Sequence, residues 1–223
     1  MHMRALLLLC LTLAPFADAS HSIMGDSTLV KRVKHVYGEP AARRTTVWQA
    51  MLKTMKAKPE THKLYEVNLF FNQLNFVDDY KLWGKVDYWA TPVEMIGNNA
   101  GDCEDFTIAK YFTLRELGVD DAKLRLIYVK ALHLNQFHMV LAYYPTPDSD
   151  PLLLDNLDPE IKYASKRNDL FPVYSFNGSR LWLSKERGRS ILAGKASRLS
   201  LWNDVKSRIR SSEMKKAIVN YDG

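Results

Sequence analysis

Cys103 is the residue whose type and setting point most directly to chemistry. It stands in the stretch NNAGDCEDFTIAKYFTLRELG, residues 98–118, at the expected start of a helix, with Asp102, Glu104 and Asp105 around it. The dipole and free N–H groups of a helix N-terminus favour the thiolate, which is the nucleophilic form of cysteine. Neighbouring carboxylates oppose that ionisation, so the stretch predicts a nucleophile only if something positive lies nearby.

A thiol nucleophile needs a base, and the chain offers His133 and His138 downstream. His133 falls in an expected turn, where exposed histidines are ordinary. His138 lies in FHMVLAYY, residues 137–144, whose alternation predicts a strand with His138, Val140 and Ala142 on one face. We therefore expect His138 to be the base.

An imidazole that acts as base needs an acceptor on its second nitrogen, commonly Asp or Asn. Asp155 ends the apolar run PLLLDN, where burial explains an acid poorly and a polar partner explains it well. Asp158, in an Asp-Pro turn, and Asn156 are the alternatives for this role. Cys103, His138 and Asp155, on a helix start followed by two adjacent strands, have the layout of papain-like and transglutaminase-like cores.

The three acids around Cys103 allow two interpretations. As helix-terminal residues, Asp102 would cap the helix, and Glu104 and Asp105 would complement its dipole. Three carboxylates within four residues, beside a thiolate, nevertheless repel each other. The helix dipole supplies only about half a positive charge to offset this repulsion, whereas a bound cation would supply more. Their oxygens favour a hard ion, calcium before magnesium, although EF-hand spacing is missing, so both interpretations stay open. Zinc has little support because Cys103 is the one cysteine outside the first ten residues and no close histidine pair is present.

The first residues, MHMRALLLLCLTLAPFADAS, have the features of a cleavable secretory signal peptide over residues 1–19, with cleavage after Ala19. Cleavage would leave Cys103 as the one cysteine of an exported protein, either buried and inert or used for chemistry. The net charge of +6 is compatible with acidic partners, but export and the lack of a binding motif argue against nucleic acid as a partner.

The remaining residues, 20–223, predict a single domain because no linker or repeat divides them. Helical spacing is found first, over residues 45–59, 61–76, 92–97, with a Thr91–Glu94 capping box, and 103–117. Strand patterns follow, over residues 123–131, 137–144, 151–156 and 171–183, the last with an Asn177-Gly178 hairpin signal, before a basic amphipathic helix over 196–210. Short connections favour antiparallel pairing, so we expect an α+β fold with the cysteine helix packed on an antiparallel sheet.

The stretch from Val67 to Gly118, together with FHMVLAYY and LLLDNL, resembles the bacterial transglutaminase-like cysteine peptidases, and most closely their LapG-type periplasmic proteases. The resemblance runs over roughly residues 30–210 and is densest over 64–183. GDCEDF together with DYWATP is its most specific signature.

This resemblance implies a periplasmic, calcium-dependent thiol endopeptidase with the triad Cys103, His138 and Asp155. It also implies that Asp102 and Glu104, and with them Asp105, belong to a calcium site. The family substrate is a large biofilm adhesin at the outer membrane, cut in its N-terminal region, and an inner-membrane receptor that senses cyclic di-GMP sequesters the protease. A transglutaminase-like acyltransferase or amidase with the same triad is the alternative.

Overall fold

The structure is a computed structural model that describes residues 26–184 and 190–222. The predicted signal peptide, residues 1–19, lies outside the described residues, so its cleavage stays a prediction. The assignment of residues 20–223 to one domain also stays a prediction. In the part of the chain that is described, no helix is both long and apolar enough to cross a membrane.

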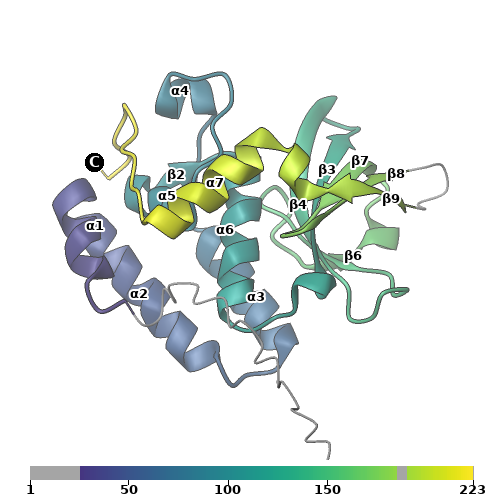
Figure 1. Cartoon of the computed structure of the whole chain (residues 1–223), viewed down its shortest axis with the longest axis horizontal. Helices are drawn as coiled ribbons and strands as arrows, with labels where there is room; N and C mark the ends of the chain where they lie inside the picture. Colours follow the sequence, from purple (N-terminus) through teal and green to yellow (C-terminus); the bar gives the residue numbers. More distant parts are fainter. Residues whose placement is uncertain (1–25, 185–189, 223) are drawn as a thin grey trace, which may run out of the picture.

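Helices and a large sheet form the two halves of an α+β fold, as the sequence predicts (Figure 1). The α-helices of the described residues are α1 (Leu29–Tyr37), α2 (Glu39–Met55), α3 (Glu60–Phe71), α4 (Asp79–Trp83), α5 (Pro92–Asn98), α6 (Cys103–Glu116) and α7 (Ser200–Ser211). In Figure 1, α6 lies in the middle of the molecule, with α1 and α2 on one side and the sheet on the other.

The large sheet has seven strands, and every neighbouring pair runs antiparallel. They are β3 (Leu124–Ala131), β4 (Gln136–Tyr143), β5 (Leu152–Leu154), β6 (Lys162–Tyr163), β7 (Leu170–Phe176), β8 (Arg180–Ser184) and β9 (Ser190–Lys195). Their spatial order is β6-β5-β4-β3-β7-β8-β9. The short β5 pairs with β4 only from Leu141 to Tyr143, so no described strand covers that edge of β4 around His138.

The apolar stripe of α6 is buried between the helical half and the sheet. Phe106, Ala109 and Leu114 of α6 are at most 2% exposed, and Leu126 and Leu141 of the sheet are fully buried in the same cluster. Burying a leucine or phenylalanine side chain stabilises a fold by about 1.5–3 kcal/mol. This packing holds the start of α6 against β4.

Several predicted elements are found with shifted ends. The helix expected from residue 45 already begins at Glu39, because Pro40 suits the first turn of a helix. The capping box of Thr91 and Glu94 is present at the start of α5, and the predicted hairpin signal lies between β7 and β8. No sequence pattern predicted α1 or β9.

The helix expected over residues 61–76 ends earlier, at Phe71, because the chain then enters a short parallel pairing. β1 (Asn75–Phe76) pairs with β2 (Ala100–Gly101), immediately before the cysteine helix. A Cβ on Gly101 would lie 2.7 Å from the Cβ of Asp105, closer than real side chains approach. Glycine is therefore required where the chain turns into α6, which accounts for the Gly in the GDC motif.

The basic helix predicted over residues 196–210 is found as α7, but one of its basic side chains is buried. Its Arg208 is 2% exposed and forms ion pairs with Glu94 of α5 and with Asp204. Its guanidinium also donates to the backbone carbonyl oxygen of Trp89. The reason is that Glu94 is fully buried, and a buried carboxylate needs a partner of opposite charge.

Candidate active site

Cys103 is the first residue of α6, with Asp102 as its N-cap. The Thr107 hydroxyl lies 2.8 Å from the carbonyl oxygen of Cys103 and 2.9 Å from that of Met139, which joins the first turn of α6 to β4. The Met139 backbone N–H is also a donor toward the cysteine sulfur, where it favours the thiolate. The sulfur therefore lies beside the residue that follows His138 in β4.

His138 and Asp155 form a buried pair next to this position. His138 Nε2 lies 2.7 Å from Asp155 Oδ1, and the two residues are 3% and 1% exposed. Asp155 directly follows β5, and His138 of β4 is paired with Val129 of β3. Because Nε2 is engaged with Asp155, Nδ1 is the nitrogen left to exchange a proton with a thiol.

Asp155 is ionised in this setting. Burial alone would raise its pKa, but hydrogen bonds from His138, the Leu157 backbone N–H and Arg167 together lower the pKa to about 2. Asp158, the alternative acid, instead forms an ion pair with Lys162 at 2.8 Å. The structure thus brings Asp155 and not Asp158 onto the imidazole.

The thiol of Cys103 carries its proton when the chain is considered by itself. Burial, together with the charges of Glu104 and Asp102, raises the pKa of the thiol well above its ordinary value. The sulfur donates to Glu104 Oε2 at 3.0 Å. The acids next to Cys103 therefore oppose its ionisation in the folded protein, as the sequence suggests. The helix dipole and the Met139 N–H do not offset their effect on the pKa of the thiol.

The acids that oppose the thiolate gather in a cluster with a third, distant residue. Oxygens of Asp79, Asp102 and Glu104 all lie within 4.8 Å of one another. Burial and the neighbouring carboxylates raise the pKa of Asp79 to about 7 and that of Asp102 to about 11. In the described part of the chain, Oδ1 of Asp79 and Oδ1 of Asp102 are buried without a hydrogen-bond partner. A set of orphaned carboxylate oxygens at this spacing fits a hard divalent cation.

Asp105 does not join this acid cluster, although the sequence groups it with Asp102 and Glu104. It is fully buried, and its oxygens accept from the backbone N–H groups of Ala90, at 2.6 Å, and Asp102, at 3.3 Å. Asp105 therefore braces α6 against the DYWATP segment, which explains why the two motifs occur together.

Asp79 was not anticipated as a member of the cluster. It is the first residue of α4 and lies 23 positions before Asp102. The only signal in the sequence is its place in a pair of acids just before the aromatic segment. That signal is weak, because a pair of acids is also what a helix start favours.

Together, a nucleophile helix packed on an antiparallel sheet and a cysteine beside a histidine–carboxylate pair define a transglutaminase-like thiol hydrolase. The family described as bacterial transglutaminase-like cysteine proteinase matches residues 39–186. The chain belongs to this family of cysteine proteinases.

Solved structures of LapG from Legionella pneumophila are similar over most of the chain. The EGTA-treated form is 43% identical, with a TM-score of 0.73, and the match covers 82% of this chain and 96% of that one. The calcium-bound form is 45% identical, with a TM-score of 0.70 and coverage of 81% and 97%. No curated protein sequence matches with comparable significance.

Proposed function

We propose that this protein is a calcium-dependent cysteine endopeptidase in which Cys103 is the nucleophile, His138 the base and Asp155 the residue that orients the imidazole. The observation that carries the proposal is the 2.7 Å contact between His138 Nε2 and Asp155 Oδ1. It lies one residue along β4 from the backbone N–H that faces the Cys103 sulfur.

The geometry supports the following reaction. Nδ1 of His138 takes the thiol proton, and the Cys103 sulfur attacks the peptide carbonyl carbon. The imidazolium then gives its proton to the leaving amine, and a thioester forms on Cys103. Water, deprotonated by the same imidazole, hydrolyses the thioester and frees the sulfur. Asp155 stays ionised throughout, since its pKa is lowered to about 2, and it stabilises the imidazolium. The Cys103 backbone N–H, at the start of α6, is placed to receive the oxyanion.

Calcium would be held by Asp79, Asp102 and Glu104. Bound there, it would supply the positive charge that offsets the carboxylates next to Cys103 and so favour the thiolate. The support is twofold: the orphaned oxygens of Asp79 and Asp102, and the calcium-bound form of the Legionella relative. Asp105 is not among the proposed ligands because its oxygens accept backbone N–H groups.

For the biological role we propose action in the periplasm, after removal of residues 1–19, on the N-terminal region of a large adhesin at the outer membrane. Cleavage would release the adhesin and promote biofilm dispersal. An inner-membrane receptor that senses cyclic di-GMP would sequester the protease. These proposals rest on the family resemblance and on the 43% identity to LapG.

Incubation of purified protein with N-terminal fragments of candidate exported adhesins, with and without calcium, tests the proposal by gel electrophoresis. We expect discrete cleavage with calcium and none with the Cys103→Ala variant. An added fluorescent amine separates hydrolysis from acyl transfer, because a transferase would attach it to the substrate. Predominant amine incorporation, or cleavage by the Cys103→Ala variant, would contradict the assignment.

A further inference from the structure

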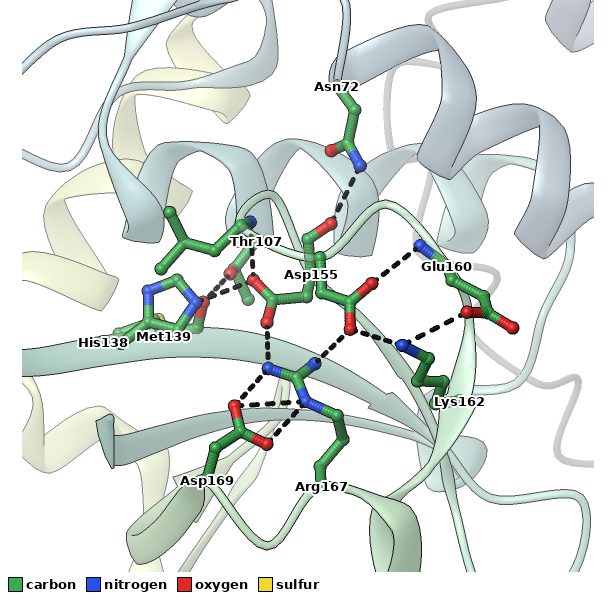
Figure 2. Close-up of polar contacts among 11 residues, drawn as sticks. Asn72, Thr107, His138, Met139, Asp155, Glu160, Lys162, Arg167 and Asp169 are labelled. Atoms are coloured by element: carbon green, nitrogen blue, oxygen red, sulfur yellow. Dashed lines mark hydrogen bonds and ion pairs between the residues drawn. The ribbon is translucent and has the colours of Figure 1, made fainter. Parts of the chain in front are cut away.

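Arg167 contacts the triad acid on the side away from the imidazole. It follows a short 3₁₀ turn (Ala164–Lys166) and precedes β7, and only 7% of its surface is exposed. Its Nη2 donates to Asp155 Oδ2 at 2.9 Å, while Oδ1 of the same carboxylate faces His138. Figure 2 shows Asp155 between the imidazole and the guanidinium.

Asp169 holds Arg167 in turn. Its oxygens accept from Arg167 Nε at 3.0 Å and from Nη2 at 2.8 Å, a two-point contact that fixes the orientation of the guanidinium (Figure 2). The backbone carbonyl oxygen of Asp169 accepts from Leu132 N at 2.8 Å, at the end of β3. The four side chains His138, Asp155, Arg167 and Asp169 therefore form a continuous chain of hydrogen bonds anchored to the sheet.

Both oxygens of the Asp155 carboxylate are engaged. Oδ1 faces His138 Nε2 and accepts from Leu157 N, and Oδ2 accepts from Arg167. Lys110 of α6 is the other buried cation whose charge acts on Asp155, but among the described residues no hydrogen bond joins the two. Without Arg167, Oδ2 would be a buried oxygen without a donor, and the carboxylate could turn away from the imidazole.

We propose that Arg167 is a positioning residue of the peptidase reaction: by holding Oδ2 of Asp155, it keeps Oδ1 on His138 Nε2 and Nδ1 free for the Cys103 thiol. This inference rests on the proposed function of the triad. A purely structural role, in which Arg167 anchors only the segment before β7, is the alternative.

The chain supplies a control in Arg208, which is also buried and is paired with two carboxylates, Glu94 and Asp204. Arg167 has close ion pairs with Asp155 and Asp169 and a longer one, at 3.9 Å, with Asp158. Arg208 contacts no residue of the triad. Replacing either arginine with methionine removes the same charge from a buried network. Only Arg167→Met should alter the alignment of the imidazole.

The experiment compares kcat and KM for peptide cleavage, at saturating calcium, in the wild type, Arg167→Met, Arg167→Lys and Arg208→Met, each corrected for the folded fraction. We expect Arg167→Met to lower kcat by about 10- to 100-fold with KM nearly unchanged, because misplaced catalytic groups cost this much. Arg167→Lys should lie between, since one ammonium cannot serve Asp155 and Asp169 together. Arg208→Met should lower the unfolding midpoint but not kcat.

A second measurement does not depend on peptidase activity. The Nε2 proton of His138 should give a downfield, slowly exchanging NMR signal in the wild type and in Arg208→Met, and a broadened or absent one in Arg167→Met. If the wild type cleaves nothing but these signals behave as expected, the proposed function fails, while the measurement still shows that Arg167 holds Asp155 on His138. Equal kcat in Arg167→Met and Arg208→Met, or an unchanged signal, would overturn the role. If Arg167→Met does not fold, a folded Arg167→Lys with full kcat would do the same.

Discussion

Asp155 and the acid cluster of Asp79, Asp102 and Glu104 both belong to the candidate site, but the carboxyl group of Asp155 and those of Asp79 and Asp102 ionise in opposite ways. Asp155 has its pKa lowered to about 2, whereas the pKa of Asp79 rises to about 7 and that of Asp102 to about 11. Burial raises the pKa in all three. The difference is that Asp155 has the basic side chains of His138 and Arg167 as partners, while the charged groups that act on Asp79 and Asp102 are other carboxylates.

The comparison shows which part of the site the chain completes by itself. The pair of His138 and Asp155 is satisfied by side chains and a backbone N–H, and it needs nothing from outside. The acid cluster has orphaned oxygens and raises the pKa of the Cys103 thiol. One acid group therefore orients the base, and the other creates the need for a cation.

The largest expected effect comes from removing the imidazole of the His138–Asp155 pair. His138→Ala removes the group that moves the proton, and we expect kcat to fall about 10⁴-fold or more at any calcium concentration. His133→Ala is the matched control, because His133 is exposed in the turn before β4 and should keep full activity. Kinetics with a peptide substrate measure both, and near-normal turnover by His138→Ala would remove it from the mechanism.

Asp155→Asn should lower kcat by about 10²- to 10⁴-fold, because an amide can no longer stabilise the imidazolium. Asp158→Asn, only three residues away, should change kcat far less, since Asp158 pairs at 2.8 Å with Lys162 and only at 3.9 Å with Arg167, rather than with the imidazole. The ratio of the two rates measures the effect. Comparable losses of kcat in the two variants would contradict the assignment of Asp155, rather than Asp158, as the acid that orients His138.

Calcium should act on the acid cluster and not on the His138–Asp155 pair. A chelator should abolish cleavage, and added calcium should restore it, because the acid cluster otherwise suppresses the thiolate. Asp79→Asn should raise the calcium concentration needed for half-maximal activity by about 10-fold, an effect typical of a change at a metal site. The neighbour Asp78 is exposed and acts on Asp79 only through its charge, so Asp78→Asn is the control and should change that concentration far less. Full activity in excess chelator would rule out the metal.

The smallest expected effect is on the pH dependence of the free energy of unfolding. Asp155 and the acid cluster should contribute to it with opposite signs. The pKa of Asp155 is lowered from 3.8 to about 2, so it contributes about 2 kcal/mol above pH 3.8, which is lost as the pH falls toward 2. Asp79 and Asp102 have raised pKa values, so their contribution is present below pH 3.8 and lost as the pH rises.

Unfolding midpoints measured in chelator between pH 5 and pH 8 should therefore decrease with pH, and saturating calcium should reverse the trend. Asp155→Asn should lose the stabilisation above pH 3.8 and keep the calcium-dependent trend. A midpoint in chelator that rises steadily over this range would show that the acids of the cluster do not repel one another as the geometry implies.

The sequence by itself determined the helix that begins at Cys103, the strand that carries His138 and the apolar run that ends at Asp155. Each follows from a local pattern: a helix-capping position, an alternation of apolar and polar residues with a period of two, or an acid at the end of an apolar run. These patterns also predicted an α+β fold, because the helical and alternating segments are separate along the chain.

Only the tertiary structure decided which side chains meet. Asp79 joins Asp102 across 23 residues, Asp105 turns to the Ala90 N–H, and Arg208 turns inward to Glu94. Arg167 reaches the triad acid from a turn whose sequence shows no sign of it. The physical reason is that burial and charge pairing depend on contacts between distant segments, whereas periodicity and capping report only on neighbours within a few residues along the chain.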